Sequence, residues 1–261
     1  MPSYGRRRWG RRSLVSAAAG VALCVVIALP VWGYASQSAR TITVKSGPKP
    51  VFKSATTRCP RGQHVLFGGY KNGVAGMRRT ADDLWTVDGF NLGGAPLKLT
   101  SYAYCGKGSV SSRHTKRVVV TSYGTATAKC PAGKVVVAGG FATSPNSVFA
   151  VQRLVRIGTD RWQVSGYLRY GITKRTELTA IAYCGKGPAP KAVSQSIQLS
   201  SDGGRTKAAC PSGKRLLFGG MVARASKPRT VLVFLMRVED TNSWAVANST
   251  AGRLTAIAYC R

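Results

Sequence analysis

Three short signatures recur along this chain in the same order three times. Each copy opens with Cys-Pro-x-Gly, and a Gly-Gly pair begins nine residues after that cysteine. A Trp-x-Val segment follows, and Leu-Thr-x-x-Ala-Tyr-Cys closes the copy. The residues that mark the three copies are Cys59, Trp85 and Cys105; Cys130, Trp162 and Cys184; and Cys210, Trp244 and Cys260. Repetition of this kind predicts three copies of one structural unit, which we place at residues 36–108, 109–188 and 189–261.

Each unit has the pattern of antiparallel β-structure. β-branched and aromatic residues form short runs that are separated by Gly, Pro and Ser, as is typical of strands and turns. Cys-Pro-x-Gly predicts a tight turn, because Pro restricts φ and Gly tolerates positive φ. The Gly-Gly pair predicts a bulge or a close approach of strands, and we expect the repeated Trp in the core. We expect five strands in each unit: 41–44, 118–121 and 196–199 open the units, and the later strands include 135–137, 148–157, 216–218 and 231–238.

Six of the seven cysteines lie two to a unit. Repeat symmetry favours a disulfide within each unit: Cys59–Cys105, Cys130–Cys184 and Cys210–Cys260. Sequence alone leaves other connectivities open. One is a ring that joins Cys105–Cys130, Cys184–Cys210 and Cys59–Cys260.

The first 35 residues resemble an export signal. Five arginines between positions 6 and 12 precede an uncharged, mostly apolar run over 14–35, which we expect to form a helix. The run fits a signal peptide with a cleavage site near Ala35, and it is also long enough to remain as a transmembrane anchor. In both cases residues 36–261 are predicted to be exported. The protein would then be secreted, or held at the cell surface by this segment.

The charge of the chain is extreme. Its 39 Lys and Arg against 8 Asp and Glu give a net charge of +31. So few carboxylates, together with only two histidines, disfavour acid–base catalysis and metal binding, and we expect neither an enzyme nor a cofactor. The signatures also supply no nucleophile with a base beside it.

This positive charge predicts a polyanionic partner, because counterion release favours the binding of polyanions. Basic residues recur after the Cys-Pro-x-Gly turns and in the hairpins. The candidate binding residues are Arg78, Arg79, Lys134, Lys174, Arg175, Lys214, Arg215, Arg224, Lys227 and Arg229. The expected partner is an acidic cell-wall polymer, an acidic glycan or an anionic lipid surface. Nucleic acid would bind only without sequence preference, since no nucleic-acid-reading motif is present.

The order of Cys-Pro-x-Gly, Gly-Gly, Trp-x-Val and Ala-Tyr-Cys resembles a repeat of secreted proteins of high-GC Gram-positive bacteria, most of which have no assigned activity. The Cys-Pro-x-Gly opening and the final strand that ends in Cys also resemble the vitelline membrane outer layer protein family. That resemblance implies three repeats in a β-prism with pseudo-threefold symmetry, and a carbohydrate-related role. Three small β-sandwich modules in tandem are the alternative fold. Neither resemblance supplies a catalytic residue.

The sequence therefore predicts an all-β, disulfide-bonded protein of three repeats, without enzymatic activity, that binds a polyanion of the cell envelope or its surroundings. Two alternatives remain. One is a lectin-like module that recognises neutral sugars through Trp or Tyr side chains, and the other is a purely structural envelope protein.

Overall fold

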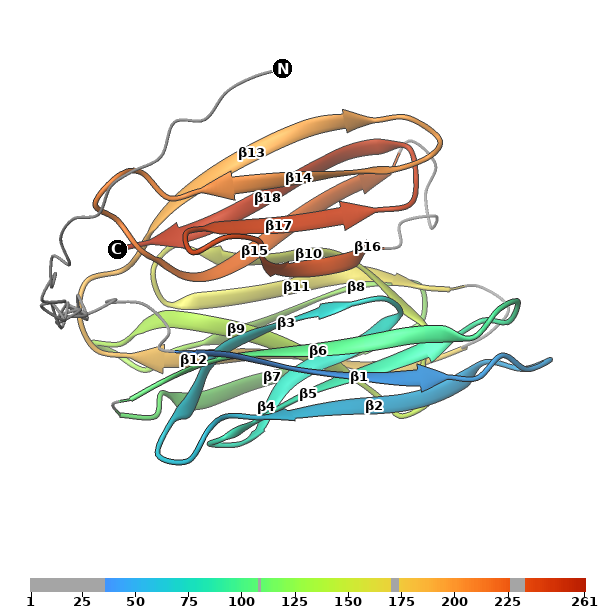
Figure 1. Cartoon of the computed structure of the whole chain (residues 1–261), viewed down its shortest axis with the longest axis horizontal. Helices are drawn as coiled ribbons and strands as arrows, with labels where there is room; N and C mark the ends of the chain where they lie inside the picture. Colours follow the sequence, from blue (N-terminus) through green and yellow to red (C-terminus); the bar gives the residue numbers. More distant parts are fainter. Residues whose placement is uncertain (1–35, 108, 170–173, 226–232) are drawn as a thin grey trace, which may run out of the picture. The chain divides into compact units, whose positions relative to one another are not determined.

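The computed structural model describes residues 36–107, 109–169, 174–225 and 233–261, and in these ranges all regular secondary structure is β (Figure 1). Each repeat contributes six strands. Those of the first repeat are β1 (Ser36–Val44), β2 (Val51–Arg58), β3 (His64–Lys71), β4 (Val74–Ala81), β5 (Leu84–Asn91) and β6 (Leu97–Gly106). Those of the second are β7 (Ser112–Val120), β8 (Tyr123–Lys129), β9 (Val135–Thr143), β10 (Phe149–Ile157), β11 (Arg161–Leu168) and β12 (Thr176–Gly185). Those of the third are β13 (Lys191–Leu199), β14 (Gly204–Ala209), β15 (Leu216–Ala225), β16 (Val233–Val238), β17 (Ser243–Asn248) and β18 (Gly252–Cys260).

The expected N-terminal helix, with its signal-peptide and anchor interpretations, falls within residues 1–35 and so lies outside the described residues. Across the ranges that the structure does describe, no helix is suited to crossing a membrane.

The strands form three six-stranded antiparallel sheets, and every sheet is shared by two repeats. The strand orders are β1-β6-β3-β16-β17-β14, β2-β5-β4-β9-β12-β7 and β13-β18-β15-β10-β11-β8. Each repeat places its first, third and sixth strands in one sheet and its second, fourth and fifth strands in another. The sheets are completed where the third strand of one repeat pairs with the fourth strand of a neighbour: β3 with β16, β9 with β4, and β15 with β10.

This exchange of strands excludes one of the two expected architectures. A tandem β-sandwich module would build its sheets from its own strands alone, whereas here each repeat supplies half of the strands of two different sheets. The alternative of three independent modules is therefore wrong. The three sheets instead enclose one continuous apolar core to which all three repeats contribute.

The expectation of five strands per repeat was one strand short. The missed strands are β2, β8 and β14, which directly precede the Cys-Pro-x-Gly turns. Their inward residues are small, as with Ala126 and Ala128 in β8, while exposed polar residues alternate with them. Such a segment has the two-residue period of a strand, but its buried positions hold small residues and give no clear run of large apolar side chains.

The Cys-Pro-x-Gly turns form as expected. In the first repeat the N–H of Gln63 donates to the carbonyl of Pro60 at 3.0 Å, and Gly62 has a φ of 77°. Glycine in the third position of a turn with this φ is typical of a type II turn. The other two turns repeat the bond and the positive φ, in Pro131–Lys134 with Gly133 and in Pro211–Lys214 with Gly213.

Each Gly-Gly pair lies at a close approach, in agreement with one of the two expectations. In the second repeat, a Cβ atom on Gly139 would overlap the indole ring of Trp162, and a Cβ atom on Gly140 would overlap the carbonyl oxygen of Met77 in the first repeat. The first glycine thus makes room for a buried Trp, and the second lets two repeats join. The other pairs do the same: Gly68 with Trp85 and Gly69 with Met236; Gly219 with Trp244 and Gly220 with Leu154.

The three disulfides are those favoured by repeat symmetry, and the ring alternative is wrong. Cys59–Cys105, Cys130–Cys184 and Cys210–Cys260 each join Cα atoms 5.7 Å apart. Because each bond runs from the end of a repeat's second strand to its sixth strand, it connects the two sheets to which that repeat contributes. Loops of 46 to 54 residues make each bond worth on the order of 4 kcal/mol in the chain-entropy account. Three such bonds indicate an oxidising, extracellular-type environment.

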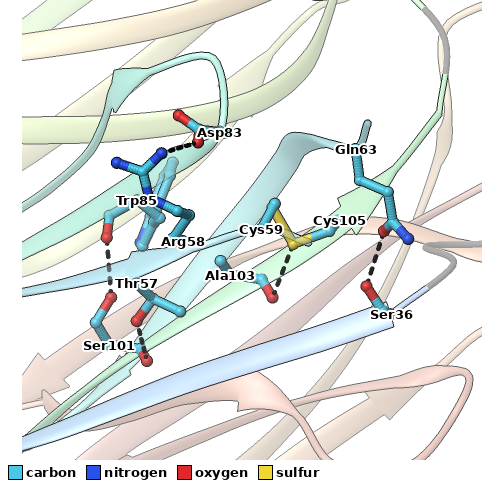
Figure 2. The surroundings of a disulfide bond; sticks show 10 residues. All are labelled: Ser36, Thr57, Arg58, Cys59, Gln63, Asp83, Trp85, Ser101, Ala103 and Cys105. Atoms are coloured by element: carbon cyan, nitrogen blue, oxygen red, sulfur yellow. Dashed lines mark hydrogen bonds and ion pairs between the residues drawn. A yellow bond between two sulfur atoms is a disulfide. The ribbon is translucent and has the colours of Figure 1, made fainter. Parts of the chain in front are cut away.

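Hydrogen bonds near the first disulfide reinforce this connection between sheets (Figure 2). The hydroxyl of Thr57 in β2 donates to the carbonyl of Ser101 in β6 at 2.9 Å. The hydroxyl of Ser101 in turn donates to the carbonyl of Trp85 in β5 at 3.1 Å. These two buried hydroxyls therefore have partners in the adjacent sheet, as their burial requires.

We predict that Gly140→Ala destabilises the protein by at least about 2 kcal/mol, because the added methyl group would push apart the backbones of the first and second repeats. Urea unfolding with the disulfides intact measures the change. Gly47→Ala, in the loop between β1 and β2, is the matched control and is expected to change the free energy of unfolding by less than about 1 kcal/mol. Equal stability of the two variants would contradict the role assigned to the second glycine.

Candidate polyanion-binding surface

Most carboxylates of the protein are already paired with a cation. Arg58 and Asp83 lie 2.6 Å apart next to the first disulfide (Figure 2). Six of the eight acidic residues take part in such pairs: Asp83, Asp88, Asp160, Glu177, Glu239 and Asp240. Most of these pairs are largely exposed and contribute little to stability. These pairs matter for the electrostatics of the surface. They engage most of the carboxylates, and most of the Lys and Arg side chains remain without a carboxylate partner.

Three of the predicted residues gather where the first repeat meets the second. The side chain of Arg78 pairs with Asp88, and the Nζ of Lys134 donates to the hydroxyl of Ser112 at 3.1 Å. Arg79 is buried, with only 7% of its surface exposed. Its guanidinium lies 4.8 Å from the ring centre of Tyr183. Arg79 is thus largely withdrawn from solvent.

Arg79 hydrogen-bonds to the linker between the first and second repeats, the segment that connects β6 to β7. Its guanidinium donates to the hydroxyl of Ser111 at 3.3 Å and also to the carbonyl of that residue. Its main-chain N–H donates to the hydroxyl of Tyr183 at 2.6 Å. We call this set, Arg79 with Tyr183 and Ser111, the first linker clamp. Burial lowers the pKa of Arg79 and raises the pKa of Tyr183.

A second linker clamp joins the second repeat to the third. The guanidinium of Arg156 lies 4.9 Å from the ring centre of Tyr259 and donates to the carbonyl of Pro190 at 2.5 Å. Its main-chain N–H donates to the hydroxyl of Tyr259 at 2.8 Å. Sequence analysis missed Arg156. The repeat alignment offers a signal, because Arg79 and Arg156 stand at equivalent positions before the polar hairpin turn.

The junction between the third and first repeats keeps the tyrosine but not the arginine. The main-chain N–H of Val238 donates to the hydroxyl of Tyr104 at 2.8 Å. No segment of chain runs from the end of the third repeat to the start of the first, so a guanidinium at position 238 would have no linker to hold. The arginine side chains therefore bind the two linkers, whereas a tyrosine hydroxyl accepts a main-chain N–H at all three junctions.

An exposed pair of arginines lies on the outer face of the β15–β18 ladder. Arg224, a predicted residue, is directly opposite Arg253. Both side chains are exposed, and no described acid forms an ion pair with either. Like charges directly opposite one another destabilise a sheet, and a bound anion would remove that cost. Sequence analysis missed Arg253, because pairing across strands is not visible in a linear sequence.

A basic hollow lies beside the third disulfide. Gly213, Lys214, Arg215 and Arg261 line it. Lys214 is exposed and Arg215 is half-buried. The main chains of Arg215 and Arg261 exchange two hydrogen bonds of 2.8 and 3.0 Å, so these residues are held side by side. The hollow unites two predicted residues with Arg261, which stands where the other repeats have Gly106 and Gly185.

The remaining predicted residues stand apart from these groups. Lys174 and Arg175 are exposed in the segment before β12, and neither lines the hollow. Lys227 and Arg229 lie outside the described residues. The predicted residues therefore do not form a single site.

Three aromatic positions are removed from consideration as ligand-binding groups. Trp85, Trp162 and Trp244 are at most 1% exposed, as expected for core residues. Within the described ranges, no three His, Cys, Asp or Glu side chains are grouped in a way that could hold a metal ion.

Comparison of the chain with protein-family models and with curated proteins found no match.

We predict that the protein loses stability as the pH rises above about 10. Burial raises the pKa of Tyr183 and of Tyr259. The unfolded chain ionises its tyrosines near pH 10, so unfolding releases protons above that pH and the free energy of unfolding falls. Below about pH 10 this contribution is fully present. Urea unfolding over pH 8 to about 11 measures the slope.

Tyr183→Phe should reduce that slope, since it removes one buried phenol. It should also cost about 1–3 kcal/mol at pH 8, because the N–H of Arg79 loses its acceptor. Tyr123→Phe is the matched control, because Tyr123 is 50% exposed. A slope equal to that of the parent protein in Tyr183→Phe would contradict the assignment.

Proposed function

We propose that this chain is a non-enzymatic, exported protein that binds a polyanion of the cell envelope or its surroundings, such as an acidic wall polymer, an acidic glycan or an anionic lipid surface. The observation that carries the proposal is the excess of cations that remains after six of eight carboxylates are paired. Residues 36–261 contain 34 Lys and Arg, and the ion pairs of the described residues involve seven of them. Counterion release then supplies the binding free energy.

The proposal extends to the protein's relationships and architecture. The repeat would group the chain with the secreted repeat proteins of high-GC Gram-positive bacteria. The three sheets would form a β-prism with pseudo-threefold symmetry, as in the vitelline membrane outer layer proteins. The cyclic exchange of strands supports this arrangement, and the disulfides support export.

The Arg224–Arg253 pair and the basic hollow are the local sites that best fit this function. Both present exposed cations, whereas Arg79 is engaged by its linker clamp. A polymer with regularly spaced phosphates or carboxylates could contact both groups along one chain. Nucleic acid would bind in the same way, through its backbone alone.

Binding to long-chain polyphosphate as a function of salt tests the function. Affinity is expected to fall steeply between roughly 50 and 200 mM salt, with a logarithmic slope of about 0.7–0.9 per phosphate contacted. Absence of binding at the lower salt concentration, or binding that does not respond to salt, would refute the polyanion proposal. Absence of binding to any envelope fraction would favour a purely structural role.

A pair of double variants tests the local site. Arg224→Gln with Arg253→Gln should reduce the salt slope by roughly 1.5 through the loss of two phosphate contacts. Lys53→Gln with Lys116→Gln removes the same charge from two other exposed positions and should reduce the slope by less. Equal effects in the two double variants would assign binding to the general field instead of the arginine pair.

One observation favours a second function, the recognition of neutral sugars. Tyr123 is 50% exposed and its ring centre lies 4.8 Å from that of Tyr167, at the edge of the third sheet. Exposed aromatic rings are suited to stacking on the apolar face of a sugar. Binding of neutral glycans that is insensitive to salt and is lost in Tyr123→Ala would support this alternative.

A further inference from the structure

Three arginines lie together on one face of the sheet β13-β18-β15-β10-β11-β8. Arg224 in β15 is directly opposite Arg253 in β18. Arg153 in β10 is directly opposite Val222, which precedes Arg224 by two residues in β15. Residues two apart in a strand point to the same face, so Arg153 is the diagonal neighbour of Arg224. We call Arg153, Arg224 and Arg253 the arginine triad.

The triad points away from the apolar core. The residues that adjoin the three arginines in sequence, Leu154, Ala223 and Leu254, are at most 2% exposed and belong to the core. Because successive side chains of a strand point to opposite faces, the arginines lie on the outer face. Arg153 is half-buried there, and the other two are exposed. The triad is therefore open to a ligand from solvent.

No acidic group on the strands of this sheet balances the triad. The six strands, all within the described residues, contain no Asp, Glu or His. Asp160 and Asp202 lie in turns at the ends of these strands. The first pairs with two other cations, and the second accepts a hydrogen bond from a neighbouring serine. The ion pairs of the described residues do not include the triad, and the Nε of Arg153 is buried there without a hydrogen-bond partner.

The fold itself does not require the triad. The other two sheets have the same order of strands, and their equivalent positions follow from the strand pairings and the Gly-Gly pairs. In place of the three arginines, one sheet has Leu235, Gly73 and Lys98, and the other has Gly76, Ser144 and Glu177. Neutral residues and even a carboxylate are therefore compatible with this framework. Like charges side by side destabilise a sheet, and a bound anion removes that cost.

We infer that the arginine triad binds a phosphate monoester group, as found at the end of a polymer, on a phosphorylated sugar or on a lipid headgroup. The inference rests on the proposed function and names the anionic group that one site recognises. With strands about 4.8 Å apart and a rise of about 3.4 Å per residue, the Cα atoms of Arg153 and Arg253 lie about 12 Å apart. Long arginine side chains from these positions reach a common ion above Val222.

The number of charges in the triad favours a monoester over other anions. A guanidinium group binds two phosphate oxygens at once with its planar fork of N–H donors. A phosphate monoester has three free oxygens and close to two negative charges at neutral pH. A phosphodiester or a carboxylate has two free oxygens and one charge, so it leaves part of the triad without a partner.

NMR titration of the full chain with methyl phosphate, dimethyl phosphate and acetate tests the inference, in about 100 mM salt to screen distant charges. Methyl phosphate should shift the Nε–H signals of the triad. It should bind at least about fivefold more tightly than the other two anions, which is the effect of one extra unit charge about 4 Å from a cation in water. Equal affinities for the three anions, or no binding of methyl phosphate, would overturn the inference.

The pH dependence provides a second readout, because the second ionisation of a phosphate monoester has a pKa of about 6. Lowering the pH from about 7.5 to about 5 should weaken methyl phosphate binding about threefold and leave dimethyl phosphate binding unchanged. The side chains of this sheet that could titrate are Lys, Arg and Tyr, which keep their charge state in this range. They are Lys129, Lys191, Arg156, Arg161, Tyr123, Tyr167 and Tyr259. Both histidines lie in strands of the other two sheets. Methyl phosphate binding that does not respond to pH would contradict the assignment.

Single variants locate the ligand. Arg153→Gln and Arg224→Gln should each weaken methyl phosphate binding at least about fivefold through the loss of one adjacent charge. Lys98→Gln is the matched control, because it removes one exposed cation from the equivalent of position 253 in another sheet, and it should change the affinity less than about twofold. Thermal unfolding confirms that each variant is folded. Unchanged binding in folded Arg153→Gln and Arg224→Gln would refute the site.

Competition identifies the source of the group and separates this inference from the proposed function. Displacement of methyl phosphate by mannose 6-phosphate but not by phosphatidic acid vesicles would support a glycan, and displacement by both would support a lipid headgroup. Displacement by neither would overturn the inference. Salt-dependent binding of polyphosphate without binding of methyl phosphate would overturn the inference alone, whereas the reverse result would overturn the polyanion proposal alone.

Discussion

The contact on which this structure depends is the approach of one repeat's backbone to the second glycine of the next repeat's Gly-Gly pair. At Gly69, Gly140 and Gly220 a carbonyl oxygen of the neighbouring repeat occupies the space that a Cβ atom would need. Only there do two half-sheets become one sheet of six strands. The disulfides then connect each sheet to the next, and the tyrosine hydroxyls accept the N–H groups of Arg79, Arg156 and Val238 near these junctions.

The sequence was most informative where the same residue type recurred in all three repeats. The disulfide pairs, the turns and the buried tryptophans could be predicted because each signature appears three times and has one dominant physical cause. The second strand of each repeat could not, because small residues, mainly alanine, occupy its inward positions and give no clear run of apolar side chains. The exchange of strands between repeats could not be predicted either. A Gly-Gly pair indicates that another group packs closely against the backbone, but it does not indicate that this group is a strand of a different repeat.

The candidate site shows the same division. Lys214 and Arg215 were predicted from their place after a turn, and the structure places Arg261 beside them in the hollow. Arg79 has the same charge and a similar local sequence, yet it is buried on Tyr183 and holds a linker. Arg79 and Arg156 each bind the segment that connects two repeats. The equivalent position of the third repeat, which no such segment follows, holds Val238, and this difference is the only sign of the arginines' role in the repeat alignment. Charge alone therefore leads to a proposed class of partner but does not select the contact residues.

Sharing every sheet between neighbours has a consequence for a lone copy of this unit. One repeat by itself would display two three-stranded half-sheets, each ending in an unpaired strand at the glycine junction. Such edges bind other strands, so an isolated copy would be driven to associate with two others or to aggregate. Fusing three copies in one polypeptide replaces that concentration-dependent association with a folding step inside a single molecule, and it leaves one junction, between the last copy and the first, held without any covalent connection.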